Sequence, residues 1–220
     1  MTRRFAAYTV LAVLIPAATL AQAPPRRVPQ ARKAAAAPES VQLLLAPAGN
    51  EARFIVRERL MIADLPNDAI GTTSALSGGI TIGPGGRIDP ETSRISVQMA
   101  TLKTDNEHRD TWIREHTLRT DSFPTAVFAV KELRGLPVPL PTSGTLTLTM
   151  LGDFTVHGVT RPWTWDVTLT ANGNEYVGRA TTHLKFEDFG MEQPRLMIVV
   201  SVVDDVKLEY DFHFVKSTMK

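Results

Sequence analysis

Two short segments concentrate the side chains that could carry out acid–base chemistry. Residues 101–110 include Asp105 and Arg109, and residues 153–162 include His157 followed by glycine. A hydrolase or isomerase that pairs His157 with Asp105 or Arg109 is one hypothesis, because an oriented histidine is the commonest general base. The alternative is structural. A strand-to-helix junction needs a cap and ion pairs in any case, and His157 can bond backbone groups in a tight turn or contact a ligand headgroup.

Other kinds of chemistry are excluded or disfavoured by composition. The chain has no cysteine, which excludes disulfides, thiolate zinc sites, iron–sulfur clusters and a cysteine nucleophile. It has no serine-nucleophile elbow, phosphate-binding loop or paired-histidine zinc motif, and its five histidines are scattered. With 24 Lys+Arg against 23 Asp+Glu, the net charge of +1 disfavours a nucleic-acid partner. We expect neither an enzyme nor a cofactor or metal; the alternative for the histidines is a metal site assembled from distant parts of the chain.

Most of the chain after residue 40 alternates apolar and polar residues, the period of a β-strand with one buried face. The alternation is clearest over residues 95–99, 145–150, 163–169 and 206–214. Shorter strand candidates are Val41–Leu45, Phe54–Leu60, Ser77–Ile82, Thr125–Leu133, Tyr176–Phe186 and Leu196–Val203. Asn172-Gly173 is typical of a hairpin turn. Many short strands separated by turn residues predict an all-β sandwich or barrel.

One segment breaks this pattern. From Asn106 to Arg119, Trp112, Ile113 and His116 recur at helical spacing among charged residues. This predicts a short amphipathic helix that closes one end of the β structure, with Asp105 as its N-cap.

The N-terminal 40 residues are expected to lie outside the fold. Residues 1–23 have a basic start, an apolar stretch and an Ala-Gln-Ala site, the layout of a cleaved secretory signal peptide. Residues 24–40 are rich in Pro, Ala and Arg and predict a flexible linker, or a basic arm that touches anionic lipid headgroups transiently. The folded domain is then 41–220, in a periplasmic or secreted protein.

Four blocks in order resemble the YceI-like family of secreted bacterial lipid-binding proteins. They are Asp105–Asp110 continuing to Phe123-Pro124, Asp153–Pro162, Asp188-Phe189-Gly190, and Asp205–Leu208. The resemblance implies an extended, lipocalin-like antiparallel β-barrel with one short helix near its mouth. It also implies a bound long amphiphilic isoprenoid, of the polyprenyl or quinone-precursor type.

The strand alternation independently indicates which apolar side chains point into such a barrel, whose interior either holds one small ligand or is filled by side chains. The candidate ligand-binding residues on this basis are Phe54, Val56, Ile95, Val97, Phe128, Val130, Leu148, Trp163, Trp165, Val167, Leu208, Tyr210 and Phe212, and the candidate polar contacts are His157 and Arg109. If these side chains pack solidly, the alternative is a surface or stress-related interaction module with a filled barrel.

Overall fold

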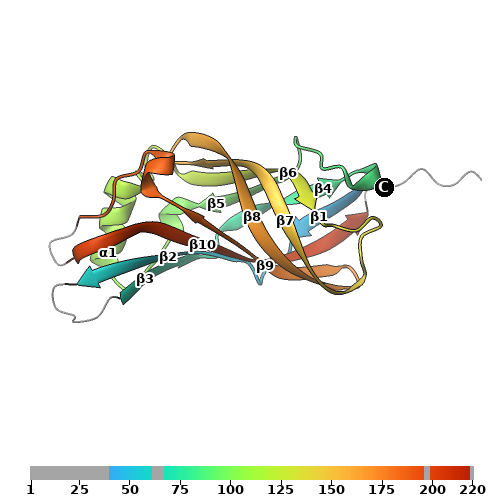
Figure 1. Ribbon diagram of the computed structural model, residues 1–220, viewed down its shortest axis with the longest axis horizontal. Helices are drawn as coiled ribbons and strands as arrows, with labels where there is room; N and C mark the ends of the chain where they lie inside the picture. Colours follow the sequence, from blue (N-terminus) through green and yellow to red (C-terminus); the bar gives the residue numbers. More distant parts are fainter. Residues whose placement is uncertain (1–39, 61–66, 196–198, 219–220) are drawn as a thin grey trace, which may run out of the picture. The chain divides into compact units, whose positions relative to one another are not determined.

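The computed structural model describes residues 40–60, 67–195 and 199–218, so the predicted signal peptide and most of the linker lie outside the described residues. The described part is all-β with one short α-helix, as predicted from the alternation (Figure 1). The strands are β1 (Val41–Leu45), β2 (Glu51–Leu60), β3 (Asn67–Thr73), β4 (Leu76–Ile82), β5 (Arg94–Gln98), β6 (Thr125–Arg134), β7 (Ser143–Val156), β8 (Val159–Asn172), β9 (Glu175–Leu184) and β10 (Val199–Thr218). The helical segments are η1 (Pro84–Gly86), η2 (Met99–Thr101), α1 (Glu107–Trp112), η3 (Ile113–Thr117) and η4 (Phe186–Phe189).

The strands form a closed antiparallel barrel. The hydrogen-bonded order runs β1-β4-β5-β6-β7-β8-β9-β10, and β10 pairs back with β1. β2 follows β1 along the same edge of β10, and β3 pairs with β2 before the chain continues into β4. β1–β2 and β3–β4 therefore act as two interrupted strands, and the barrel has eight strands in all among the described residues. Closure leaves few unpaired strand edges, which stabilises the sheet.

The structure corrects two details of the sequence prediction and confirms a third. β3 was not predicted, because Asn67, Asp68 and Gly71 give it low β-propensity. The candidates Leu196–Val203 and 206–214 are not two strands, since one strand, β10, runs from 199 to 218. The hairpin at Asn172-Gly173 is confirmed, with Gly173 and Asn174 between the paired ends of β8 and β9.

The predicted helix is present but is capped differently. Asn106, not Asp105, is the N-cap, and its side-chain oxygen accepts a hydrogen bond from the Arg109 amide at 3.0 Å. The Asp105 side chain instead accepts a hydrogen bond from the Arg109 guanidinium. After Trp112 the helix loosens into a π-turn, η3. Together α1 and η3 lie at one end of the barrel, which we call the α1 end (Figure 1).

Charged side chains link three strands on the outer face. Arg53 of β2 binds Glu209 and Asp211 of β10 at 2.9 and 2.6 Å. Arg179 of β9 binds the same Asp211 at 2.5 Å. These cations hold the pKa of Asp211 below its ordinary value, the hydrogen bond from Arg179 being the largest cause. The network therefore stabilises the β2–β10–β9 part of the barrel at neutral pH.

Candidate ligand-binding cavity

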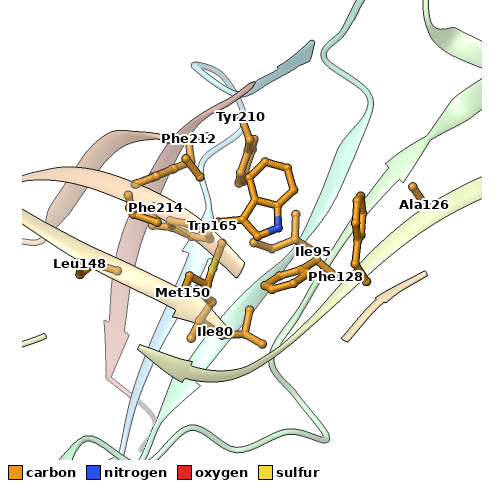
Figure 2. Packing of buried hydrophobic residues seen from close by; sticks show 14 of the residues in the cluster. Ile80, Ile95, Ala126, Phe128, Leu148, Met150, Trp165, Tyr210, Phe212 and Phe214 are labelled. Atoms are coloured by element: carbon orange, nitrogen blue, oxygen red, sulfur yellow. The ribbon is translucent and has the colours of Figure 1, made fainter. Parts of the chain in front are cut away.

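The barrel interior is divided into a packed part and an open part. On β7, β8 and β10 every second residue points into the barrel, and Figure 2 shows several of these side chains packed together. Leu148, Val167 and Phe212 are buried and pack with other apolar side chains in the half away from α1. One inward position closer to α1, Met150, Trp165 and Tyr210 border a cavity. We call these three residues the floor of the cavity.

The cavity extends along the barrel from α1 to the floor. Its volume is about 170 Å³, and on β10 its wall runs from Val202 to Tyr210. Its wall is apolar except for Arg53, Glu58, Arg109, Thr117, Trp165, Glu209 and Tyr210.

Nine of the fifteen residues selected from the sequence lie in the cavity wall. They are Phe54, Val56, Ile95, Val97, Arg109, Phe128, Trp165, Leu208 and Tyr210. Six do not. Val130, Leu148, Val167 and Phe212 lie in the packed half, and Trp163 packs between Phe154 and Phe189 with its indole nitrogen bonded to Thr182 at 3.0 Å. The sixth is His157.

His157 supports a turn rather than the cavity. It occupies the tight connection between β7 and β8 with φ of +50°, followed by Gly158 with φ of +75°. Its ring packs edge-on against Phe123, and its Nδ1 lies 3.3 Å from the carbonyl oxygen of Phe189. A side chain at position 158 would collide with Phe123, whose Cε1 would lie 2.5 Å from the added Cβ, so glycine is required there. Its contacts are those of the structural alternative.

Arg109 enters the cavity wall from α1 as part of an ion pair. Its Nη2 donates to Glu58 of β2 at 2.8 Å, and its Nη1 donates to Asp105 at 2.7 Å. The Glu58 and Arg109 residues are only 4% and 9% exposed. Asp110 is also buried but accepts hydrogen bonds from the amide and hydroxyl of Thr104. The acidic and basic residues of this segment thus fix α1 onto the barrel.

Sequence reasoning missed several wall residues, among them Ala126, Met150, Phe154, Val156 and Glu58. For Glu58 a signal was available, because it alternates in phase with the inward-pointing Phe54 and Val56. A carboxylate at an inward position needs a cationic partner, and Arg109 lies 51 residues away in sequence.

Three wall residues carry buried polar atoms that have no hydrogen-bond partner within the described ranges. They are the Trp165 indole nitrogen, the Tyr210 hydroxyl and the Thr117 hydroxyl. Burial raises the pKa of Tyr210 above its ordinary value, so its hydroxyl remains protonated and can donate. Buried polar groups usually have a hydrogen-bond partner, so the missing partner of each of these three groups requires an explanation.

Neither Asp105 nor Arg109 is a hydrogen-bond or ion-pair partner of His157 in the described part of the chain. No group of three potential metal ligands is found among the residues that the structure describes. No described helix has the length and apolar character needed to span a membrane.

Comparison with known proteins identifies the family to which this barrel belongs. The model of the YceI-like domain matches residues 44–214. The chain belongs to the YceI-like domain family. Among curated relatives, a UPF0312 protein of Pseudomonas putida is 32% identical over 114 residues, and one of Pseudomonas fluorescens is 31% identical over 113. Each alignment covers 48% of this chain and 56% of the relative, so the chain spans about half the length of the curated relatives it matches.

Solved structures share the fold of this YceI-like protein. A polyisoprenoid binding domain from Saccharophagus degradans aligns with a TM-score of 0.63 and 13% identity, over 80% of this chain and 98% of the other. Burkholderia cenocepacia BcnA aligns with a TM-score of 0.53 and 15% identity, over 77% and 96%. At these identities the comparison shows the barrel architecture.

Proposed function

We propose that this protein binds a long amphiphilic lipid of the isoprenoid class in the cavity at the α1 end. The observation that carries the proposal is a mostly apolar cavity that extends along the inside of a closed barrel from α1 to the floor. A hydrocarbon chain buried there contacts apolar side chains along its length. The description of the Saccharophagus degradans relative as a polyisoprenoid binding domain supports the choice of ligand class.

Burial of apolar surface supplies enough free energy for such binding. Each buried CH₂ group contributes about 0.8 kcal/mol, so a five-carbon isoprene unit contributes on the order of 4 kcal/mol before the costs of association. Burial of several units therefore offsets the cost of association, roughly 4–15 kcal/mol, without a charged headgroup contact. Protein groups that transform the lipid are not needed for this role.

The two competing hypotheses are less well supported. An interaction module with a filled barrel requires close packing throughout, and the α1 half is not packed in this way. A hydrolase or isomerase requires His157 beside an acid in the cavity, whereas His157 contacts Phe123 and the Phe189 carbonyl.

We further propose that the protein acts outside the cytoplasm, as a carrier or buffer that contacts membranes transiently. The support is the signal-peptide pattern of residues 1–23 and the basic residues of 24–40. N-terminal sequencing of the protein from its native cells should begin near residue 24. A protein that retains Met1 in the cytosolic fraction would refute this location.

The binding proposal can be tested with one plugging substitution. Ala126 is buried and lies in the cavity wall, so Ala126→Phe places a ring in the void. Val127→Phe is the matched control, because the neighbouring side chain points to the other face of β6. We expect mass spectrometry of solvent extracts to show a lipid in the wild type and the control but not in Ala126→Phe.

Binding of added farnesol to delipidated protein provides a second measurement. Ala126→Phe should weaken binding roughly tenfold or more, since it removes the space for at least one buried isoprene segment. Equal lipid content and equal farnesol affinity in Ala126→Phe and the wild type would show that the cavity is not the binding site.

A further inference from the structure

The floor of the cavity contains two hydrogen-bond donors in an otherwise apolar environment. The Trp165 indole nitrogen and the Tyr210 hydroxyl are buried without a partner among the described residues, in side chains that belong to residues only 7% and 5% exposed. Each unsatisfied donor is energetically costly in an interior of low polarity. Their occurrence together at the end of one cavity points to a shared ligand atom.

We propose that the ligand binds with a neutral carbonyl oxygen at the floor, held by Trp165 and Tyr210, and with its hydrocarbon chain extending toward α1. This inference rests on the proposed lipid-binding function and specifies the polar group and the orientation of the ligand.

The strand register brings the two donors to the same region of the barrel. Ala180 of β9 pairs with Val167 of β8 on one side and with Tyr210 of β10 on the other. Trp165 is the inward-pointing residue two positions before Val167. Trp165 and Tyr210 therefore lie on either side of β9, offset by two residues along the strands. Ala180 is fully buried and presents only a methyl group, which leaves space for both rings. Figure 2 shows the Trp165 indole beside Tyr210, with its nitrogen on the side of Ile95.

The chemistry of the donors selects the ligand atom. An indole N–H can only donate, and a protonated phenol donates most readily to an oxygen. One carbonyl oxygen has two lone pairs and can therefore accept from both groups. A ketone, quinone, ester or amide meets this requirement, whereas a pure hydrocarbon leaves both donors unsatisfied.

The surrounding charges indicate that the bound oxygen is neutral. Two cations border the cavity among the described residues, and both are already paired: Arg53 with Glu51, Glu209 and Asp211, and Arg109 with Glu58 and Asp105. A carboxylate or phosphate at the floor would be desolvated without a counter-ion, at a large cost. Such a group would instead be expected near α1, where Thr117 has its own unsatisfied hydroxyl.

The test compares two probes of equal length on delipidated protein. One is farnesylacetone, and the other is the hydrocarbon in which a methylene group replaces the carbonyl oxygen. We expect the wild type to bind the ketone roughly tenfold more tightly, which corresponds to about 1.4 kcal/mol. Tyr210→Phe and Trp165→Phe should each reduce this preference, measured as the ratio of the two affinities, several-fold.

A control and a spectroscopic readout separate binding from folding. Tyr176→Phe removes another buried tyrosine hydroxyl, one that donates to the Pro141 carbonyl away from the cavity, and should keep the preference. The carbonyl stretch of bound ¹³C-labelled ketone should lie at lower frequency than in hydrocarbon solvent and shift upward in Tyr210→Phe.

The possible outcomes are distinct. If wild-type protein binds both probes equally, or if Thr117→Val and not Tyr210→Phe abolishes the preference, the carbonyl does not lie at the floor and the inference is wrong, although lipid binding stands. The same conclusion follows if the carbonyl stretch is unchanged in Tyr210→Phe, which would mean that a water molecule satisfies the donors. If neither probe binds, the proposed function fails together with the inference.

Discussion

The ion pair between Glu58 and Arg109 provides a sharp test of how α1 is attached to the barrel. The only hydrogen-bond partner of the Glu58 carboxylate among the described side chains is Arg109, at 2.8 Å. Arg109→Met therefore leaves a buried carboxylate without a cation, and removing one partner of a buried pair typically costs about 3–5 kcal/mol. We expect a loss of unfolding free energy of that size.

The reverse substitution should be milder. Glu58→Gln keeps an oxygen that accepts a hydrogen bond, and Arg109 retains Asp105 at 2.7 Å. We expect a loss of about 1–2 kcal/mol. The double variant Glu58→Leu/Arg109→Met should recover much of the stability lost in Arg109→Met, because well-packed apolar side chains can replace a buried ion pair.

Urea unfolding of the full chain at neutral pH, followed by circular dichroism, measures these differences. Arg57→Met is the control, because Arg57 pairs with Asp68 on the exposed face of the same strand and should have no measurable effect. The reasoning is refuted if Arg109→Met is no more destabilising than Glu58→Gln, since the pair would then be hydrated in solution.

Two further predictions concern the wall and the outer face. A Cβ at Gly71 would overlap the Phe54 ring, so Gly71→Ala should push Phe54 from its place in the cavity wall. The substitution should weaken farnesol binding and destabilise the protein by about 1–3 kcal/mol in urea unfolding. Unchanged farnesol binding would show that the wall adapts freely. Arg179 and Arg53 lower the pKa of Asp211 in the folded state, so its contribution to stability is present above the ordinary carboxyl pKa of 3.8 and is lost as pH falls below it. Thermal unfolding between pH 6 and pH 2 should therefore show a smaller acid-induced loss of stability in Asp211→Asn, and parallel curves for the two proteins would contradict this.

Alternation predicts which face of a strand is buried but not how deep a residue lies in the barrel. Phe128 and Val130 are two residues apart on the same face of β6, yet Phe128 borders the cavity and Val130 belongs to the packed half. The same holds for Trp165 and Val167 on β8. Height along the barrel depends on strand tilt and on side-chain volumes from all strands together, which no single segment encodes.

The local sequence pattern also does not predict contacts between residues that are far apart in the chain. Arg109 and Asp105 lie in the same short segment of the sequence, and the structure shows a hydrogen bond between their side chains. The partner that is most buried, Glu58, comes from a strand whose position relative to α1 is set by barrel closure. The helix cap differed by one residue, because Asn106 and Asp105 are both good caps and only the path of the chain decides between them.

Buried apolar side chains lie beyond Met150, Trp165 and Tyr210 and do not border the cavity, so the cavity is closed at this end. A bound lipid must then leave through the opening by which it entered, and a second lipid cannot displace it from the closed end. Exchange would follow the first-order rate at which the occupant departs, independent of competitor concentration. Loading and unloading would both depend on how α1 is held against β2.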